Sequence, residues 1–229
     1  MDDRRVTRVI LASGSPRRLE LLRSLGLDVV VKRSGYGEPS IAGVSPERLA
    51  TLHAREKLAS ALRAAAESAA ADLPVIAADT VVDAGGVALG KPADAGDAAR
   101  MLRLLSGREH RVHTAFALSL PGVASPVEEL STALVRFYPL DDREIAEYVE
   151  SGEPLDKAGG YGIQGRAAAL VESIAGDFYT VMGFPLARFV RTMRRLGFSL
   201  PTANPVAPST AASAAHTVGA ADFHVPGRT

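Results

Sequence analysis

The chain has 229 residues, 47% of them hydrophobic, which is enough apolar material for the core of one or two compact domains. It contains no cysteine, which excludes disulfides, thiolate metal sites and a cysteine nucleophile and suits a reducing cytoplasm. Basic and acidic side chains number 26 each, and no segment approaches the roughly 20 apolar residues of a membrane span, so we expect a cytoplasmic protein without nucleic-acid or membrane partners.

The first predicted elements are a short strand and the helix that follows it. Residues 9–12 are apolar and indicate a buried strand. Ser15 and Pro16 are typical of an N-cap and a first helical residue, and leucines then recur at helical spacing until Gly26 ends the helix.

Arg17 and Arg18 lie in the first turn of this helix, where the helix dipole disfavours cations by on the order of 0.3 to 1 kcal/mol. A bound phosphate would offset that cost. The free backbone N–H groups of residues 14–17, a hydroxyl of Ser13 or Ser15 and the two guanidinium groups would together form a polyanion site. Two arginines that simply point into solvent fit this segment equally well.

Strand and helix patterns then alternate, which predicts an α/β protein. The next expected elements are a strand at 28–33, a long alanine-rich helix from 46 to about 70, a strand at 74–78, and a hairpin of 80–83 with 87–89. They are followed by a helix at 94–105, antiparallel strands at 110–120 and 127–138, a helix at 140–151, a glycine-rich loop at 156–165, a strand at 168–174 and a helix at 184–196.

The composition changes near residue 200. The segment that begins at Pro201 has four prolines and almost no charge, so it lacks the apolar surface needed to order itself. We therefore expect one domain over residues 1–199 and a flexible tail over 200–229.

Two carboxylates are candidates for chemistry. Asp79 follows the small and apolar residues 75–78, so we expect it at the carboxyl end of a strand, where open α/β sheets usually bind ligands. It suits a metal ligand, a base that activates water, or a carboxylate that stabilises a turn. Glu38, on the loop 34–40, can share a metal with Asp79 or lie on the surface, and oxygen ligands favour Mg²⁺ or Mn²⁺ over zinc.

The candidate cations and hydroxyl also have two interpretations each. Lys57 lies on the same helical stripe as Leu49 and His53, so it either reaches a cleft or extends along the core edge. Lys91, between a glycine and a proline, is a phosphate contact or a solvated loop residue. Thr80, next to Asp79, contacts a ligand or serves only as a strand residue.

The loop DKAGGYGIQG has four glycines in ten residues, which lets its backbone approach a ligand closely. Its Gln164 carries both a donor and an acceptor, which match the N3–H and the adjacent carbonyl of uracil or thymine. His110 and His113 do not form a metal site, because residues three apart on a strand face opposite sides. The sequence matches neither the P-loop nor the dinucleotide fingerprint, which argues against those nucleotide-binding designs.

Seven segments, in the order SGSPRR, AREK, ADTVV, GKP, SGREHRVHT, DKAGGYGIQG and GDFYTVMGFP, resemble the Maf family of nucleoside triphosphate pyrophosphatases between about residues 9 and 198. The form DKAGGYGIQG resembles the branch that acts on dTTP and UTP rather than the one that acts on methylated GTP. The resemblance implies an inosine-triphosphatase-like fold with a twisted mixed sheet, flanking helices and two lobes around a deep cleft, often in a homodimer. It also implies a metal-dependent reaction that releases pyrophosphate and leaves the monophosphate.

The resemblance also implies a role for each matching position. Asp79 would be the proton acceptor, and substrate choice would depend on Arg17, Thr80 and Gln164. The triphosphate would be held by Ser13, Arg18, Lys57 and Lys91, with Glu38 helping to place Mg²⁺ or Mn²⁺. The loop SGYGEPS has two fewer carboxylates than the SDIDE-like loop of the family.

Two alternatives to a dTTP and UTP pyrophosphatase stay open. One is an enzyme of the same fold that acts on 7-methyl-GTP or another modified purine triphosphate. The other is a nucleotide-binding regulator of cell division whose hydrolysis is incidental. The sequence does not separate this regulator from an enzyme, because both functions need the same pocket.

Overall fold

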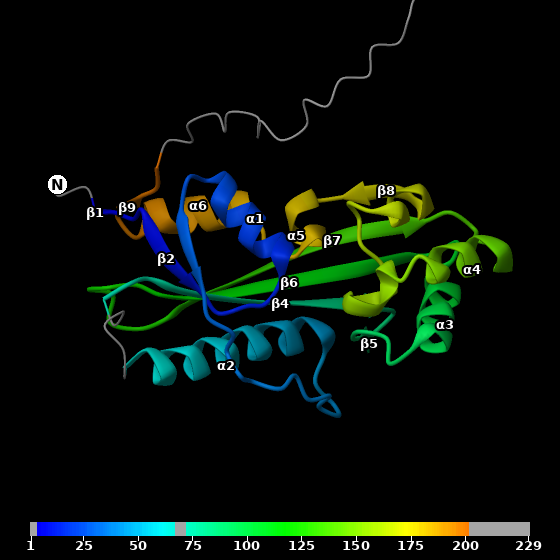
Figure 1. Cartoon of the computed structure of the whole chain (residues 1–229), viewed down its shortest axis with the longest axis horizontal. Coiled ribbons are helices and arrows are strands. Elements are labelled where there is room, and N and C mark those ends of the chain that lie inside the picture. The colour runs from blue at the N-terminus through cyan, green and yellow to red at the C-terminus, as the bar shows by residue number, and fades with distance from the viewer. Residues whose placement is uncertain (1–3, 67–71, 202–229) are drawn as a thin grey trace, which may run out of the picture.

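The computed structural model describes residues 4–66 and 72–201, in which helices surround a mixed sheet (Figure 1). The strands are β1 (Arg4–Arg5), β2 (Arg8–Leu11), β3 (Asp28–Val31), β4 (Val75–Ala84), β5 (Val87–Leu89), β6 (Glu109–Ser119), β7 (Val127–Phe137), β8 (Val171–Ala175) and β9 (Phe198–Ser199). The α-helices are α1 (Pro16–Ser24), α2 (Pro46–Ala66), α3 (Ala95–Leu105), α4 (Asp142–Glu150), α5 (Phe178–Met182) and α6 (Leu186–Arg195). Short 3₁₀ helices η1 (Glu153–Asp156), η2 (Ala158–Gly160) and η3 (Arg166–Leu170) lie between α4 and β8.

The main sheet has the strand order β3-β2-β4-β6-β7-β8, with β5 also paired to β4. Strand β2 pairs in parallel with β3 and β4, whereas the pairs from β4 to β8 are antiparallel, so the sheet is mixed, as the resemblance implied. Strands β1 and β9 form a separate parallel pair.

Strand β4 has a gap along one of its edges. Strand β6 pairs with one edge from Val75 to Asp83, so β2 and β5 must share the other edge. On that edge β2 pairs with residues 75–76 and β5 with residues 82–84. The edge near Asp79 therefore faces the space between the ends of two neighbouring strands.

Alternation along β4 directs its side chains to two different layers. Ala77 and Val81 pack with α2 on one face of the sheet, whereas Ile76 and Ala78 join a core with α1, α5 and α6 on the other. Figure 1 shows α2 on the opposite side of the sheet from α1 and α6. By the same alternation, Asp79 faces the α2 layer.

A third core lies at the far end of the long strands. It joins α3, α4, the 3₁₀ segments and the ends of β6 and β7, with Phe137 and Tyr161 among its buried rings. This core and the two cores near β2 form two lobes that share β4, β6 and β7, which agrees with the expected two-lobed α/β architecture. Within residues 4–66 and 72–201, no helix combines the length and the apolar character that crossing a membrane requires.

Local signals explain the start and end of α1. The Ser15 side chain accepts a hydrogen bond from the backbone N–H of Arg18 at 3.4 Å, and Pro16 occupies the first turn. Gly26 has a φ of +78°, which only glycine adopts without strain, and it turns the chain into β3. The predicted strand, cap and stop are confirmed here.

The prediction that Asp79 lies at the carboxyl end of a strand is wrong. Residues 74–78 and 80–83 were expected to be separate, but β4 runs without a break from Val75 to Ala84. The ladder with β6 includes Asp79, which pairs with Ala115, and this pairing keeps the backbone extended. Asp79 still reaches an open site, because the gap between β2 and β5 takes the place of a strand end.

Other differences have local causes. The strand expected at 168–174 is β8, from Val171 to Ala175, because η3 occupies the residues before it. Helix α5 was not predicted, since its five residues are too few for a helical pattern, and β1 and β9 pair residues almost 200 positions apart in the chain. The expected end of the long helix near residue 70 and the tail after residue 201 lie outside the described residues.

Candidate active site

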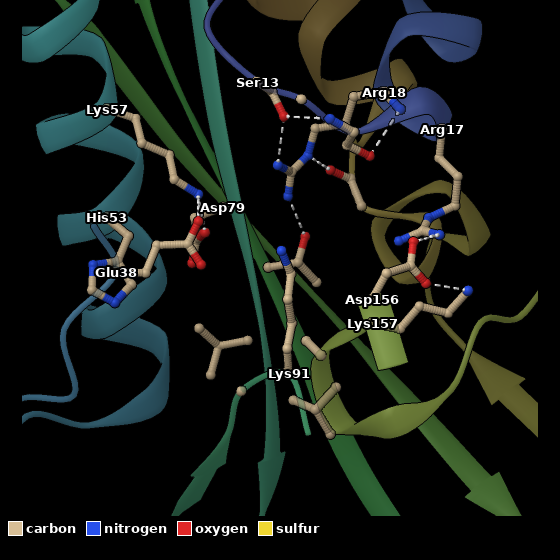
Figure 2. A pocket seen from close by; sticks show the side chains of 18 of the residues that line it. Ser13, Arg17, Arg18, Glu38, His53, Lys57, Asp79, Lys91, Asp156 and Lys157 are labelled. Carbon is tan, nitrogen blue, oxygen red and sulfur yellow. Dashed lines mark hydrogen bonds and ion pairs between the residues drawn. The ribbon is translucent and has the colours of Figure 1, made fainter. Parts of the chain in front are cut away.

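A cleft of about 730 Å³ opens at the gap in the edge of β4 (Figure 2). Its walls come from the SGSPRR segment, the loop after β3, α2, β4, the segment after β5, the glycine-rich loop and the end of α5. The predicted site residues that line it are Ser13, Ser15, Arg17, Arg18, Glu38, Lys57, Asp79, Thr80 and Lys91. One predicted residue, Gln164, is exposed on the glycine-rich loop and is not part of this lining.

Lys57 joins two carboxylates on the α2 side of the sheet. Its Nζ lies 2.6 Å from Oδ1 of Asp79 and 2.5 Å from Oε1 of Glu38. The side chains of Lys57 and Asp79 are 7% and 6% exposed, whereas that of Glu38 is 43% exposed. The group therefore has one buried ion pair and one carboxylate that is open to the cleft.

The charges around Glu38 set its protonation. Burial acts to raise the pKa of Glu38, but the ammonium of Lys57, by charge and by hydrogen bond, and the charges of Lys91 and Arg18 outweigh it. The pKa of Glu38 consequently lies below its ordinary value, and the side chain is a carboxylate at neutral pH.

Arg18 lies on the other side of β4 and is almost fully buried. Its guanidinium donates to Ser13 Oγ at 3.1 Å, to Thr80 Oγ1 at 3.0 Å and to the Gly183 carbonyl at 2.9 Å. Burial lowers the pKa of Arg18 and the carboxylates of Asp79 and Glu38 raise it, yet arginine remains charged at neutral pH. The protein thus holds this cation in a fixed orientation beside the cleft.

Arg17 faces a different wall of the cleft. Its Nη1 lies 3.8 Å from Oδ2 of Asp156 on the glycine-rich loop, as Figure 2 shows. Lys157 donates to Asp156 Oδ1 and to the Glu153 carbonyl, both at 2.6 Å. The adjacent arginines therefore have separate partners: Arg18 contacts Ser13, Thr80 and Gly183, whereas Arg17 contacts Asp156 across the cleft.

The glycine-rich loop approaches β4 closely where side chains would not fit. A Cβ placed on Gly159 would lie 2.9 Å from Cγ2 of Val82, and its φ of +69° also favours glycine. We expected these glycines to let the backbone approach a ligand closely. Gly159 instead lets the loop pack against Val82 of the sheet. Gly162 and Ile163 of the loop do line the cleft.

Several cleft residues were missed from the sequence. The guanidinium of Arg33 lies against Gly14, where a Cβ would be 3.1 Å from Arg33 Nε. Tyr36 Oη lies 3.2 Å from Nδ1 of His53, which ties the loop that carries Glu38 to the helix that carries Lys57. Only His53 had a signal in the sequence, namely its position on the inward stripe of the helix.

The two histidines that were rejected as a metal site have separate partners. His110 Nε2 lies 2.7 Å from the hydroxyl of Tyr161, whereas His113 lies 2.9 Å from Thr132 and 3.3 Å from Asp83. Burial lowers the pKa of His110 to about 4, although the charge of Asp83 acts to raise it. His110 is therefore neutral and anchors the glycine-rich loop through Tyr161.

The donor set of the cleft fits a divalent cation shared with a ligand. Glu38 and Asp79 converge on the same ammonium, so two oxygen donors lie near one point. Within residues 4–66 and 72–201, no group of three or more His, Cys, Asp or Glu side chains is placed to hold a metal ion. Mg²⁺ is usually bound by one or two carboxylates together with substrate phosphates, and Glu38 and Asp79 are two carboxylates of that kind.

The charge of the cleft points to a polyanionic ligand. In the described part of the chain, six cationic side chains line it, namely Arg17, Arg18, Arg33, Lys57, Lys91 and Lys157. Three carboxylates oppose them, namely Glu38, Asp79 and Asp156. An excess of positive charge around a buried carboxylate, in a cleft of an α/β sheet, is typical of sites for phosphate-bearing molecules.

Comparison with known proteins identifies the family. Residues 8–196 match the family described as Maf-like protein. The dTTP/UTP pyrophosphatase of Thermus thermophilus is 48% identical over 190 residues, which cover 83% of this chain and 95% of that relative. Those of Symbiobacterium thermophilum and Koribacter versatilis are each 46% identical, over 85% and 82% of this chain and 96% and 94% of the relatives. The chain belongs to the Maf family.

Among solved structures, the Staphylococcus aureus Ham1 protein superposes with a TM-score of 0.40 at 15% identity. The superposition covers 57% of this chain and 71% of that chain, and it is too weak to bear on the fold.

Proposed function

We propose that the protein is a nucleoside triphosphate pyrophosphatase that hydrolyses dTTP and UTP to the monophosphate and pyrophosphate. Relatives that match more than four-fifths of the chain at 46–48% identity carry the name dTTP/UTP pyrophosphatase. The observation that carries the proposal is Lys57, held between Asp79 and Glu38 in a cleft lined by further cations. This arrangement places a buried carboxylate next to charges that attract a triphosphate.

In this proposal the phosphates of the substrate bind in the cleft between Lys57 and Arg18. The backbone N–H groups at the start of α1, with Ser13 and Ser15, donate to phosphate oxygens, while Arg18 supplies a fixed positive charge. Lys91 is exposed on its loop and adds an ammonium from the opposite wall. These groups stabilise the charge that develops on the departing pyrophosphate.

Asp79 accepts the proton of the attacking water. Its Oδ1 is hydrogen-bonded to Lys57, which leaves Oδ2 as the atom to which a water can donate. The water oxygen bonds to the α-phosphorus, the bond from that phosphorus to the bridging oxygen breaks, and pyrophosphate leaves with the electron pair. Lys57 orients the carboxylate and opposes the negative charge that accumulates nearby.

Mg²⁺ or Mn²⁺ would be held by Glu38 and Asp79 together with phosphate oxygens, and it would neutralise phosphate charge and make the phosphorus more electrophilic. Arg17, Thr80 and Gln164 would govern substrate choice, with the Gln164 amide pairing with the N3–H and the adjacent carbonyl of uracil or thymine. A cytoplasmic location and a homodimer also belong to the proposal, and light scattering on the purified full chain tests the dimer.

The decisive experiment measures pyrophosphate release from canonical and modified triphosphates, with Mg²⁺ and Mn²⁺ compared. We expect the highest kcat/KM for dTTP and UTP. A preference for 7-methyl-GTP would replace the substrate assignment with the purine alternative. Tight nucleotide binding without turnover at saturating Mn²⁺ would instead favour a regulator and contradict the enzymatic proposal.

The role of Asp79 is tested by Asp79→Asn, which keeps the shape of the side chain and removes the base. We expect kcat to fall by about 10²- to 10⁴-fold. Asp83→Asn is a matched control, because Asp83 is a buried aspartate on the same strand, outside the cleft lining, and should leave kcat near that of the unmodified protein. Pyrophosphate release by Asp79→Asn at near the original rate would refute the proposed base.

A further inference from the structure

The loop after β3 contacts α2 through three alternate residues. The contacts are those of Ser34 with Ser60, Tyr36 with His53, and Glu38 with Lys57. On α2 the three partners are spaced by four and three positions, which places them on one side of the helix. Figure 2 shows His53, Lys57 and Glu38 together on the α2 side of the cleft. The loop therefore lies along the inward stripe of α2.

Few other interactions fix this part of the loop. Residues 33–40 make no backbone–backbone hydrogen bond with any residue that the structure describes. Within the same described ranges, a Cβ placed on Gly35 or Gly37 would meet nothing within 4 Å beyond its chain neighbours. The position of Glu38 therefore depends mainly on side chains of α2.

The contact between Tyr36 and His53 runs beside the ion pair between Glu38 and Lys57. Tyr36 precedes Glu38 by two residues on the loop, and His53 precedes Lys57 by one turn on the helix. Tyr36 Oη lies 3.2 Å from Nδ1 of His53, and the two ring centroids are 5.7 Å apart. His53 is only 4% exposed, so it gives the loop a fixed point of attachment next to the ion pair.

We propose that Tyr36 and His53 are positioning residues that hold Glu38 near Asp79 before a divalent cation binds. This inference rests on the proposed function, in which Glu38 and Asp79 hold Mg²⁺ or Mn²⁺ together with phosphate oxygens. Glu38 is the only acidic residue in 29–46, so no other carboxylate of the loop can replace it. If the loop is docked for only part of the time, the apparent affinity for the cation falls in proportion to the docked fraction.

Tyr36→Phe tests the inference, because phenylalanine keeps the ring and lacks the hydroxyl. The Mn²⁺ concentration for half-maximal pyrophosphate release from dTTP should rise by about 3- to 10-fold, the effect of losing one hydrogen bond. At saturating Mn²⁺, kcat should stay within about twofold of the original, because the residues that touch the cation and the substrate are all retained. A lower kcat with unchanged Mn²⁺ dependence would overturn the inference, since a general structural defect has that effect.

Tyr138→Phe is the matched control, because Tyr138 is half exposed and lies outside the cleft lining. It should leave the Mn²⁺ dependence unchanged. His53→Leu removes the same contact from the helix side and should act as Tyr36→Phe does. The double variant should then differ from either single variant by less than about twofold, because both changes remove one shared interaction. Effects that multiply would show independent roles and overturn the inference.

Limited trypsin digestion tests the docking of the loop without catalysis. Arg33 is exposed at the start of the loop, and cleavage after it can be followed by the mass of the fragment that ends there. Cleavage at this bond should be about 3- to 10-fold faster in Tyr36→Phe and unchanged in Tyr138→Phe, because proteolysis follows the population of the open form. An unchanged rate in Tyr36→Phe would overturn the inference and leave the pyrophosphatase proposal standing. Pyrophosphate release from no triphosphate would instead defeat the proposed function, and the digestion would still decide whether Tyr36 holds the loop.

Discussion

Lys57 and Asp79 should be strongly coupled in stability, because each is the buried partner of the other. Their charged atoms are 2.6 Å apart, and both side chains are less than a tenth exposed. Lys57→Met leaves the Asp79 carboxylate buried without this cation, which should lower the free energy of unfolding by about 3 to 5 kcal/mol. Asp79→Asn costs less in the otherwise unmodified protein, since the more exposed Glu38 still pairs with Lys57. In the Lys57→Met protein, Asp79→Asn removes a stranded charge and should restore stability.

The assay is urea unfolding at pH 7 of the unmodified protein, the two single variants and the double variant. The unfolding free energies should depart from additivity by about 2 kcal/mol or more, with the double variant more stable than the sum of losses implies. Losses that add to within about 0.5 kcal/mol would refute the reasoning, because uncoupled side chains behave in that way. Equal slopes against urea would confirm that the variants unfold from comparable native states.

Three further predictions concern single residues. Arg18→Lys loses the planar fork that reaches Ser13 and Thr80 together, so kcat/KM for dTTP should fall by about 10- to 100-fold in pyrophosphate-release assays. Between pH 6.5 and 4, His110 binds a proton in the unfolded state but stays neutral in the folded state, where its pKa is about 4, so the unmodified protein loses stability as the pH falls. His110→Gln removes this group, and urea unfolding across that pH range should show a loss of unfolding free energy that is smaller by about 3 kcal/mol. Gln164→Glu removes an amide donor and should lower kcat/KM for UTP and dTTP more than for purine triphosphates, and equal losses across bases would exclude base reading by this residue.

The sequence correctly predicted the helix ends and the hairpin turn that depend on a few neighbouring residues. Ser15 and Pro16 begin α1 and Gly26 ends it, as expected. The hairpin of β4 and β5 turns through two glycines with positive φ, which also agrees with its prediction. Each of these features depends on a few adjacent residues, so the tertiary structure had little opportunity to override them.

The composition of the site was also largely predicted, but its geometry was not. Lys57 was expected to point inward from its helix, yet nothing in the sequence paired it with Asp79, 22 positions away. Arg33 and Tyr36 gave no signal, because an arginine after a strand and a tyrosine in a loop are common on any surface. Gln164 was predicted to read a base, and it lies on the expected loop but outside the cleft lining.

The sequence by itself determined the α/β class, the caps and turns, and the set of cations and carboxylates available for phosphate chemistry. Only the tertiary structure decided that Asp79 is reached through a gap in the middle of β4, and that Arg18 contacts Gly183, 165 positions further along the chain. The physical reason is that strand pairing and buried hydrogen bonds join residues that are remote in sequence, and local patterns of polarity carry no record of such partners.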